Sequence, residues 1–135
     1  MKVAIFVPCY VDQVVPNVAV ATVRLLERLG HQVVFPAEQT CCGQPAFNTG
    51  YWPEAAELAK RQIRLFLDAA VDAVVCPSGS CTAMQMVFYP TLLAGSGCEK
   101  DAAAFLMEPI ALMKRRGMRW PLTGKFSAAR AVWAP

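Results

Sequence analysis

Histidine is almost absent from this chain of 135 residues, which contains only His31. A zinc site that mixes cysteine with histidine is therefore disfavoured. No serine stands in an elbow-like pattern that could work with His31, which argues against a serine hydrolase. The sequence also lacks a glycine-rich dinucleotide fingerprint and a P-loop. These absences remove several common cofactor and hydrolase classes.

Charge is scarce as well. Only 17% of the residues are charged and 56% are hydrophobic, so the chain has enough apolar material for one folded domain and is not disordered. The net charge is +3, and the one dense basic run is 114–116. We interpret that run as a solvated helix end, because no aromatic residues interleave with a basic face. The sequence therefore predicts no nucleic-acid partner.

Long uninterrupted apolar segments are missing too. The run from Val3 to Val7 is short and ends at Pro8, which indicates a buried strand rather than a signal peptide. Residues 73–98 carry no charge, but prolines and glycines interrupt them, which argues against a transmembrane segment. We therefore expect a cytoplasmic protein, where six cysteines serve metal or redox chemistry more often than disulfides.

What the sequence does contain is an alternation of short apolar runs and amphipathic segments. The strands are expected at 3–7, 32–35 and 73–76, and the helices at 17–29, 53–69, 81–93 and 101–115. A loop is expected at 37–52. This order predicts an α/β fold, a three-layer parallel sheet with flanking helices and right-handed crossovers.

Five of the six cysteines follow predicted strands. Cys9 follows the first strand, Cys41 and Cys42 lie in the loop after the second, and Cys76 and Cys81 follow the third. Because the carboxyl ends of parallel strands meet at one edge of a sheet, these cysteine loops are expected to converge there. The topology thus predicts one common thiol site at the carboxyl edge of the sheet.

Converging thiolates are the ligands of iron–sulfur clusters. The adjacent Cys41 and Cys42 cannot easily bridge each other, and the following Gly43 allows the backbone to approach a metal centre closely. The spacing matches neither a small ferredoxin nor a zinc ribbon. Cys81 is expected near a helix N-terminus, which favours a thiolate. For Cys76 a ligand role and a core role are equally plausible, and Cys98 is expected to be a core residue.

At these residues the chain resembles a known family. Cys9, the run Cys41-Cys42-Gly43 and the turn Gly79-Ser80-Cys81 are similar to the CCG-type cysteine-rich (Fe–S)-binding oxidoreductases, which include a cysteine-rich component of heterodisulfide reductase. Stretches such as "QTCCGQPAFNTGYWPEA" and "VVCPSGSCTAMQMVFYP" resemble the lactate-utilization members of that family. The resemblance covers residues 1 to about 93.

The resemblance implies an iron–sulfur electron-transfer subunit of a lactate (2-hydroxy acid) oxidation complex, which works with other subunits to convert L-lactate to pyruvate. It implies that Cys9, Cys41, Cys42 and Cys81 are ligands of an iron–sulfur cluster, expected to be [4Fe–4S]. Heterodisulfide reductase relatives carry an extra cysteine near the last ligand. By that analogy Cys76 is a candidate fifth thiolate, as a noncubane cluster would use.

The resemblance also sets an expectation for domain organisation. Residues 1–125 are expected to form a first CCG domain and 126–135 a divergent or truncated tail, with the family's second CCG domain absent. A half-domain of this kind would function as a homodimer or would be an inactive fragment. A further alternative is a metal-free thiol protein, in which Cys76 and Cys81 form a redox-active disulfide.

Overall fold

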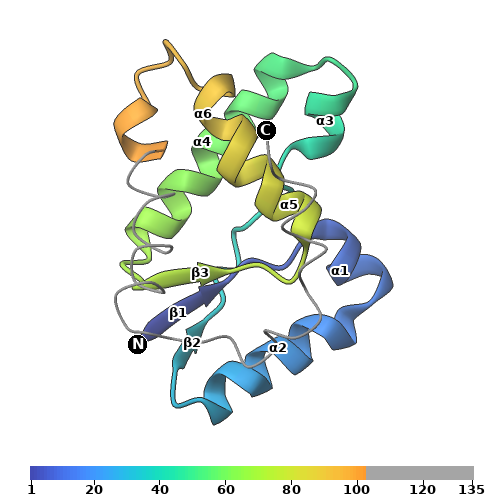
Figure 1. Ribbon diagram of the computed structural model, residues 1–135, viewed down its shortest axis with the longest axis vertical. Helices are drawn as coiled ribbons and strands as arrows, with labels where there is room; N and C mark the ends of the chain where they lie inside the picture. The colour runs from blue at the N-terminus through green and yellow to red at the C-terminus, as the bar shows by residue number, and fades with distance from the viewer. Residues whose placement is uncertain (103–135) are drawn as a thin grey trace, which may run out of the picture.

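A small parallel sheet forms the centre of the molecule. The computed structural model describes residues 1–102 (Figure 1). The strands are β1 (Lys2–Ile5), β2 (Gln32–Val34) and β3 (Ala73–Val75). They are parallel in the order β2-β1-β3, so Val3 of β1 pairs with Val33 on one side and Ala73 on the other. The predicted α/β class with a parallel sheet is confirmed.

The two long amphipathic segments form the two long helices. These are α2 (Pro16–Arg28) and α4 (Trp52–Asp68), each within one residue of the predicted range. Both carry proline in the first turn, where the missing N–H has no helical partner in any case. Periodicity at 3.6 residues is strongest in long helices, which explains why these two were predictable.

Short helices account for most of the differences from prediction. The remaining elements are α1 (Cys9–Val14), α3 (Gln44–Asn48), α5 (Gly79–Ala83), the π-helix η1 (Met84–Phe88) and α6 (Tyr89–Leu92). α1 and α3 were not predicted, because six and five residues are too few to show a helical period. The helix expected over 81–93 begins earlier, at Gly79, and contains the π-helical turn. Each strand also ends one or two residues before its predicted end.

The core lies between the sheet and α4. The buried residues of α4 include Ala55, Ala59, Ile63 and Phe66. The rings of Phe66 and Phe6 pack edge-on, with their centroids 6.2 Å apart. Met84 and Tyr89, from the helices after β3, are fully buried in the same cluster. By contrast, none of the 13 residues of α2 is buried. The core therefore connects α4 with the segment that follows Cys81.

Some predictions fall outside the described residues. The helix expected over 101–115 lies almost wholly there, as do the basic run 114–116 and the tail 126–135. Within residues 1–102, no helix is both long enough and apolar enough to cross a membrane.

Candidate metal centre

Cys9 and Cys41 bring two distant segments of the chain together. Cys9 is the first residue of α1, and Cys41 lies in the loop between β2 and α3. Their Sγ atoms are 3.7 Å apart, although 32 residues separate them in sequence. Cys9 is exposed and Cys41 is partly buried. Partial desolvation, and then the neighbouring Cys41 thiol, raise the pKa of Cys9. We call Cys9 and Cys41 the outer pair.

Three other cysteines form a second group, which we call the inner group: Cys42, Cys76 and Cys81. Cys42 and Cys81 are buried, and Cys76 is partly buried directly after β3. Cys81 is the member that both others contact. Hydrogen bonds from the thiol of Cys42 and then that of Cys76 lower the pKa of Cys81 to about 2. The same bonds to Cys81, together with burial, raise the pKa values of Cys42 and Cys76. These bonds favour the thiolate form at Cys81 and the thiol form at Cys42 and Cys76.

Ser78, just before α5, and Ser80, in its first turn, favour the thiolate form of Cys81. Hydrogen bonds from the side chains of Ser78 and Ser80 also lower the pKa of Cys81. Their hydroxyl oxygens are 3.3 Å apart. Cys81 is the third residue of α5, so the predicted position near a helix N-terminus is confirmed.

The two groups approach each other through the adjacent cysteines. Cys41 contacts Cys9 of the outer pair, whereas Cys42 contacts Cys81 of the inner group. Gly43 follows with a left-handed φ of +82°, and a Cβ at this position would lie 3.2 Å from the carbonyl oxygen of Ala55. Glycine is therefore required here both by the backbone conformation and by the close approach to α4.

Two residues that the sequence analysis did not single out contact the backbone of this site. The buried Tyr89 hydroxyl donates a hydrogen bond of 2.9 Å to the carbonyl oxygen of Cys42. Gln39, two residues before Cys41, bonds with its side-chain amide to Val7 and Ile5. A buried tyrosine normally needs a partner for its hydroxyl, but neither the burial of Tyr89 nor its partner can be read from the sequence. Nothing in the sequence distinguishes Gln39.

The thiols do not form a site for a single ion. Within the described residues, no three His, Cys, Asp or Glu side chains are arranged to hold one metal ion. A single ion needs all its donors around one point, whereas the thiolates of a cluster are distributed over several iron atoms. The five cysteines are soft donors, and soft thiolates suit zinc, copper(I) and iron–sulfur clusters.

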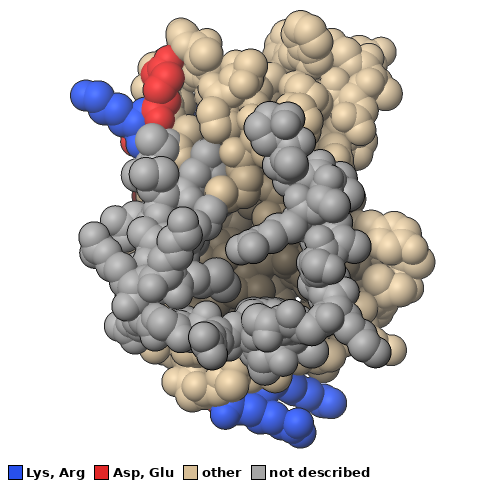
Figure 2. All heavy atoms as spheres, in the orientation of Figure 1, with Lys and Arg blue, Asp and Glu red and all other residues tan. Residues whose placement is uncertain are grey.

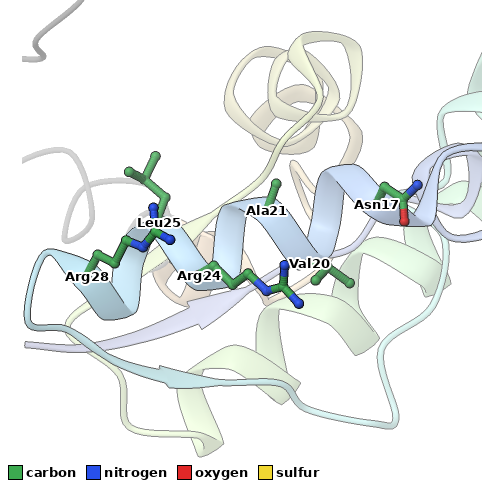
Figure 3. Close-up of a pocket in the computed structure, with 6 residues that line it drawn as sticks. All are labelled: Asn17, Val20, Ala21, Arg24, Leu25 and Arg28. Atoms are coloured by element: carbon green, nitrogen blue, oxygen red, sulfur yellow. The ribbon is translucent and has the colours of Figure 1, made fainter.

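A surface cavity is lined by α2 and not by the cysteines. It has a volume of about 420 Å³, and its described lining residues all belong to α2: Asn17, Val20, Ala21, Arg24, Leu25 and Arg28 (Figure 3). It has no thiol among these residues and follows the exposed side of one helix. On the face drawn in Figure 2, basic side chains gather at the end of the molecule where α2 lies. The cavity is therefore not part of the cysteine site.

Cys98 stands apart from the other five cysteines. It is buried and belongs to neither the outer pair nor the inner group. Its burial agrees with the expected core role.

Comparison with known proteins adds independent information. The family model described as CCG, a cysteine-rich domain, matches residues 3–85. The chain is 54% identical over 95 residues to lactate utilization protein A of Geobacillus thermodenitrificans, which covers 70% of this chain and 38% of that relative. It is 56% identical over 84 residues to lactate utilization protein A of Bacillus subtilis, which covers 62% of this chain and 34% of that relative. No solved structure matches the chain significantly.

The family match includes both members of the outer pair and all three of the inner group. It also covers more than half of the 135 residues. The chain spans little more than a third of the length of the two relatives described above. The chain belongs to the CCG family of cysteine-rich domains.

Proposed function

We propose that this domain binds an iron–sulfur cluster and serves as an electron-transfer component in the oxidation of lactate to pyruvate. Cys9, Cys41, Cys42 and Cys81 are the proposed ligands of a [4Fe–4S] cluster, and Cys76 is a candidate fifth thiolate in a noncubane cluster. The observation that carries the proposal is that five cysteines from three separate segments lie in two groups, which are joined by the adjacent residues Cys41 and Cys42.

The surroundings of the thiols fit such a group. The hydroxyl of Thr40 and the side-chain nitrogen of Gln85 are buried without a hydrogen-bond partner. Thr40 precedes Cys41, and Gln85 follows Cys81 by about one helical turn. Unpaired buried donors are rare in proteins, and sulfur atoms of a cluster accept hydrogen bonds of this kind. Their positions beside proposed ligands in the sequence make these two groups candidates for donating to a bound cluster.

The parallel topology supports a three-layer arrangement with the cysteines at the carboxyl edge of the sheet. The crossover from β1 to β2 and the crossover from β2 to β3 run in opposite directions across the sheet. If both are right-handed, α2 and α4 cover opposite faces. The cysteine segments then leave the sheet at one edge, the usual position of functional groups in such folds.

When bound, the cluster supplies one-electron redox chemistry. The residues of the chain prepare for binding in different ways. The lowered pKa of Cys81 favours the thiolate, which is the form that binds metal. Cys42 and Cys76 are held as thiols by Cys81 and must release protons on binding. Hydrogen bonds from Ser78 and Ser80 to the Cys81 sulfur would raise the reduction potential.

The role in lactate oxidation rests on the relatives, which are named lactate utilization protein A. Since the chain spans only part of their length, the remaining polypeptide of such a protein and other subunits would handle the organic substrate. We propose that the assembly is an oxidoreductase in the cytoplasm.

The first test is a double variant, Cys41→Ser with Cys42→Ser, purified without oxygen. We expect it to lose bound iron and acid-labile sulfide together, because it removes one ligand from each thiol group. Cys98→Ser is the matched control, because it changes a buried cysteine outside the site. Iron and sulfide contents equal to those of the control would refute the proposed ligands.

A second function is favoured by one contact. Because Cys76 contacts Cys81, the two could instead form a redox-active disulfide in a metal-free protein. In that case a reversible two-electron titration would be seen without metal, and Cys76→Ser would abolish it.

A further inference from the structure

The adjacent residues Cys41 and Cys42 have different sulfur partners. Cys41 lies 3.7 Å from the sulfur of Cys9, and Cys42 contacts Cys81. Neither residue belongs to a helix or a strand. Regular secondary structure therefore does not hold their side chains apart, and other contacts must fix the backbone here.

Gln39 fixes the backbone near the outer pair through side-chain hydrogen bonds. Its Oε1 accepts a hydrogen bond of 2.7 Å from the backbone N–H of Val7, and its Nε2 donates to the carbonyl oxygens of Ile5 at 3.2 Å and Pro36 at 2.9 Å. β2 has already ended at Val34, so this side-chain amide takes the place of a further strand residue beside β1.

The position of these bonds matters for the thiols. Gln39 is two residues before Cys41, and Val7 is two residues before Cys9. The bond between Gln39 and Val7 therefore joins the two segments immediately before the two sulfurs meet.

Tyr89 fixes the backbone at Cys42, which belongs to the inner group. Its hydroxyl donates to the carbonyl oxygen of Cys42 at 2.9 Å, and both residues are buried. The ring of Tyr89 belongs to the core together with Ile63 and Met84. The backbone of Cys42 is thus attached to the buried core, and the close contact of Gly43 with α4 limits movement just after it.

We propose that Gln39 and Tyr89 are positioning residues of the thiol site, which together direct Cys41 to the outer pair and Cys42 to the inner group. Neither side chain needs to touch the cluster, since both act through the backbone. The inference extends the proposed function but is stated for the reduced thiols, so it can be tested without metal.

The test uses the full chain, metal-free and reduced, with iodoacetamide as the probe and peptide mass spectrometry as the readout for each cysteine. Tyr89→Phe keeps the buried ring and removes only the hydroxyl. We expect alkylation of Cys42 to become about tenfold faster, as expected for the loss of one buried hydrogen bond. Cys98 should react at its wild-type rate. Tyr51→Phe, at an exposed tyrosine, is the matched control.

Gln39→Glu tests whether Gln39 positions the outer pair. The carboxylate can still accept from Val7 but can no longer donate to Ile5 and Pro36. A small-molecule disulfide serves as the oxidant. We expect the disulfide between Cys9 and Cys41 to form about tenfold more slowly in this variant, since the two sulfurs are no longer held together. In that reaction the two thiols lose two electrons and two protons, and the reagent is reduced to two thiols. Gln32→Glu, at an exposed glutamine in β2, is the control.

Several results would overturn the inference. Wild-type rates in both variants would show that the two side chains do not position the thiols. An equal rise at Cys98 in Tyr89→Phe would show general loosening rather than local positioning. Because metal is absent from the assay, its outcome is separate from the iron content. A protein that binds no iron but shows the expected rates would refute the proposed cluster and support the positioning.

Discussion

The outer pair and the inner group differ in how the fold holds them. Cys42 and Cys81 are only 2% and 7% exposed and belong to the hydrophobic core cluster, whereas Cys9 is exposed. The inner group stabilises a thiolate, while the pKa of Cys9 is raised. The difference teaches that the core favours a thiolate at Cys81 in the metal-free protein, whereas the Cys9 thiol faces solvent.

The largest effect should come from the shared member of the inner group. Cys81→Ser removes the sulfur that contacts both Cys42 and Cys76. We expect iron and acid-labile sulfide to fall to about a tenth of the wild-type content or less after anaerobic reconstitution. Wild-type content in this variant would eliminate the distinction between the two groups.

A smaller effect is expected in the outer pair. Cys9→Ser removes an exposed thiol, one of the proposed ligands, but leaves the inner group intact. We expect partial iron content and a cluster that is lost several-fold faster in the presence of a chelator, because solvent reaches the open position. The rate of loss, followed by absorbance, checks this. A complete loss of iron, equal to that of Cys81→Ser, would mean that the groups contribute equally.

The stability of the metal-free protein should depend on pH through the inner group. The pKa of Cys81 is about 2 in the folded protein, against about 8.5 for an unfolded thiol. Between these values folding releases a proton, so the contribution of Cys81 to stability is complete above about 8.5 and decreases as the pH falls towards 2. Urea unfolding at several pH values should therefore show the difference between wild type and Cys81→Ser shrinking on acidification. A difference that is constant or grows would contradict the assignment of the thiolate to Cys81.

Cys42 and Cys76 should make the stability of the metal-free protein depend on pH in the opposite direction. Because the pKa values of Cys42 and Cys76 are raised, their contribution is present below about 8.5 and is lost at higher pH.

The smallest effect is expected at Cys98. Cys98→Ser should leave iron and sulfide at wild-type levels and lower the free energy of unfolding by about 1 kcal/mol, since it places a hydroxyl at a buried site. Chemical denaturation and iron analysis together check both parts. Loss of iron in this variant would show that the site extends beyond the five cysteines.

The sequence was sufficient to predict the main helices and strands and to single out the candidate cysteines. Strand order along the chain and helical periodicity predicted the parallel α/β arrangement, α2 and α4. The family resemblance pointed to Cys9, Cys41, Cys42 and Cys81, whose ligand role stays a prediction. These features depend on local patterns that repeat over many residues.

The division of the cysteines into two groups could not be predicted. It depends on contacts between residues far apart in the chain, such as Tyr89 with Cys42, which are 47 residues apart. The role of Gln39 is similar, because a side-chain amide that continues a strand pairing has no sequence pattern. The short helix α1, which places Cys9 in its first turn, also lacked a usable period.

The most direct test of the central claim is the iron and acid-labile sulfide content of the anaerobically reconstituted wild-type protein, recorded together with its EPR spectrum. We expect iron and sulfide in about equal amounts and a signal that appears or disappears on one-electron reduction, as a cluster held by Cys9, Cys41, Cys42 and Cys81 requires. Protein that remains free of iron and sulfide, with all five thiols still reactive, would contradict it.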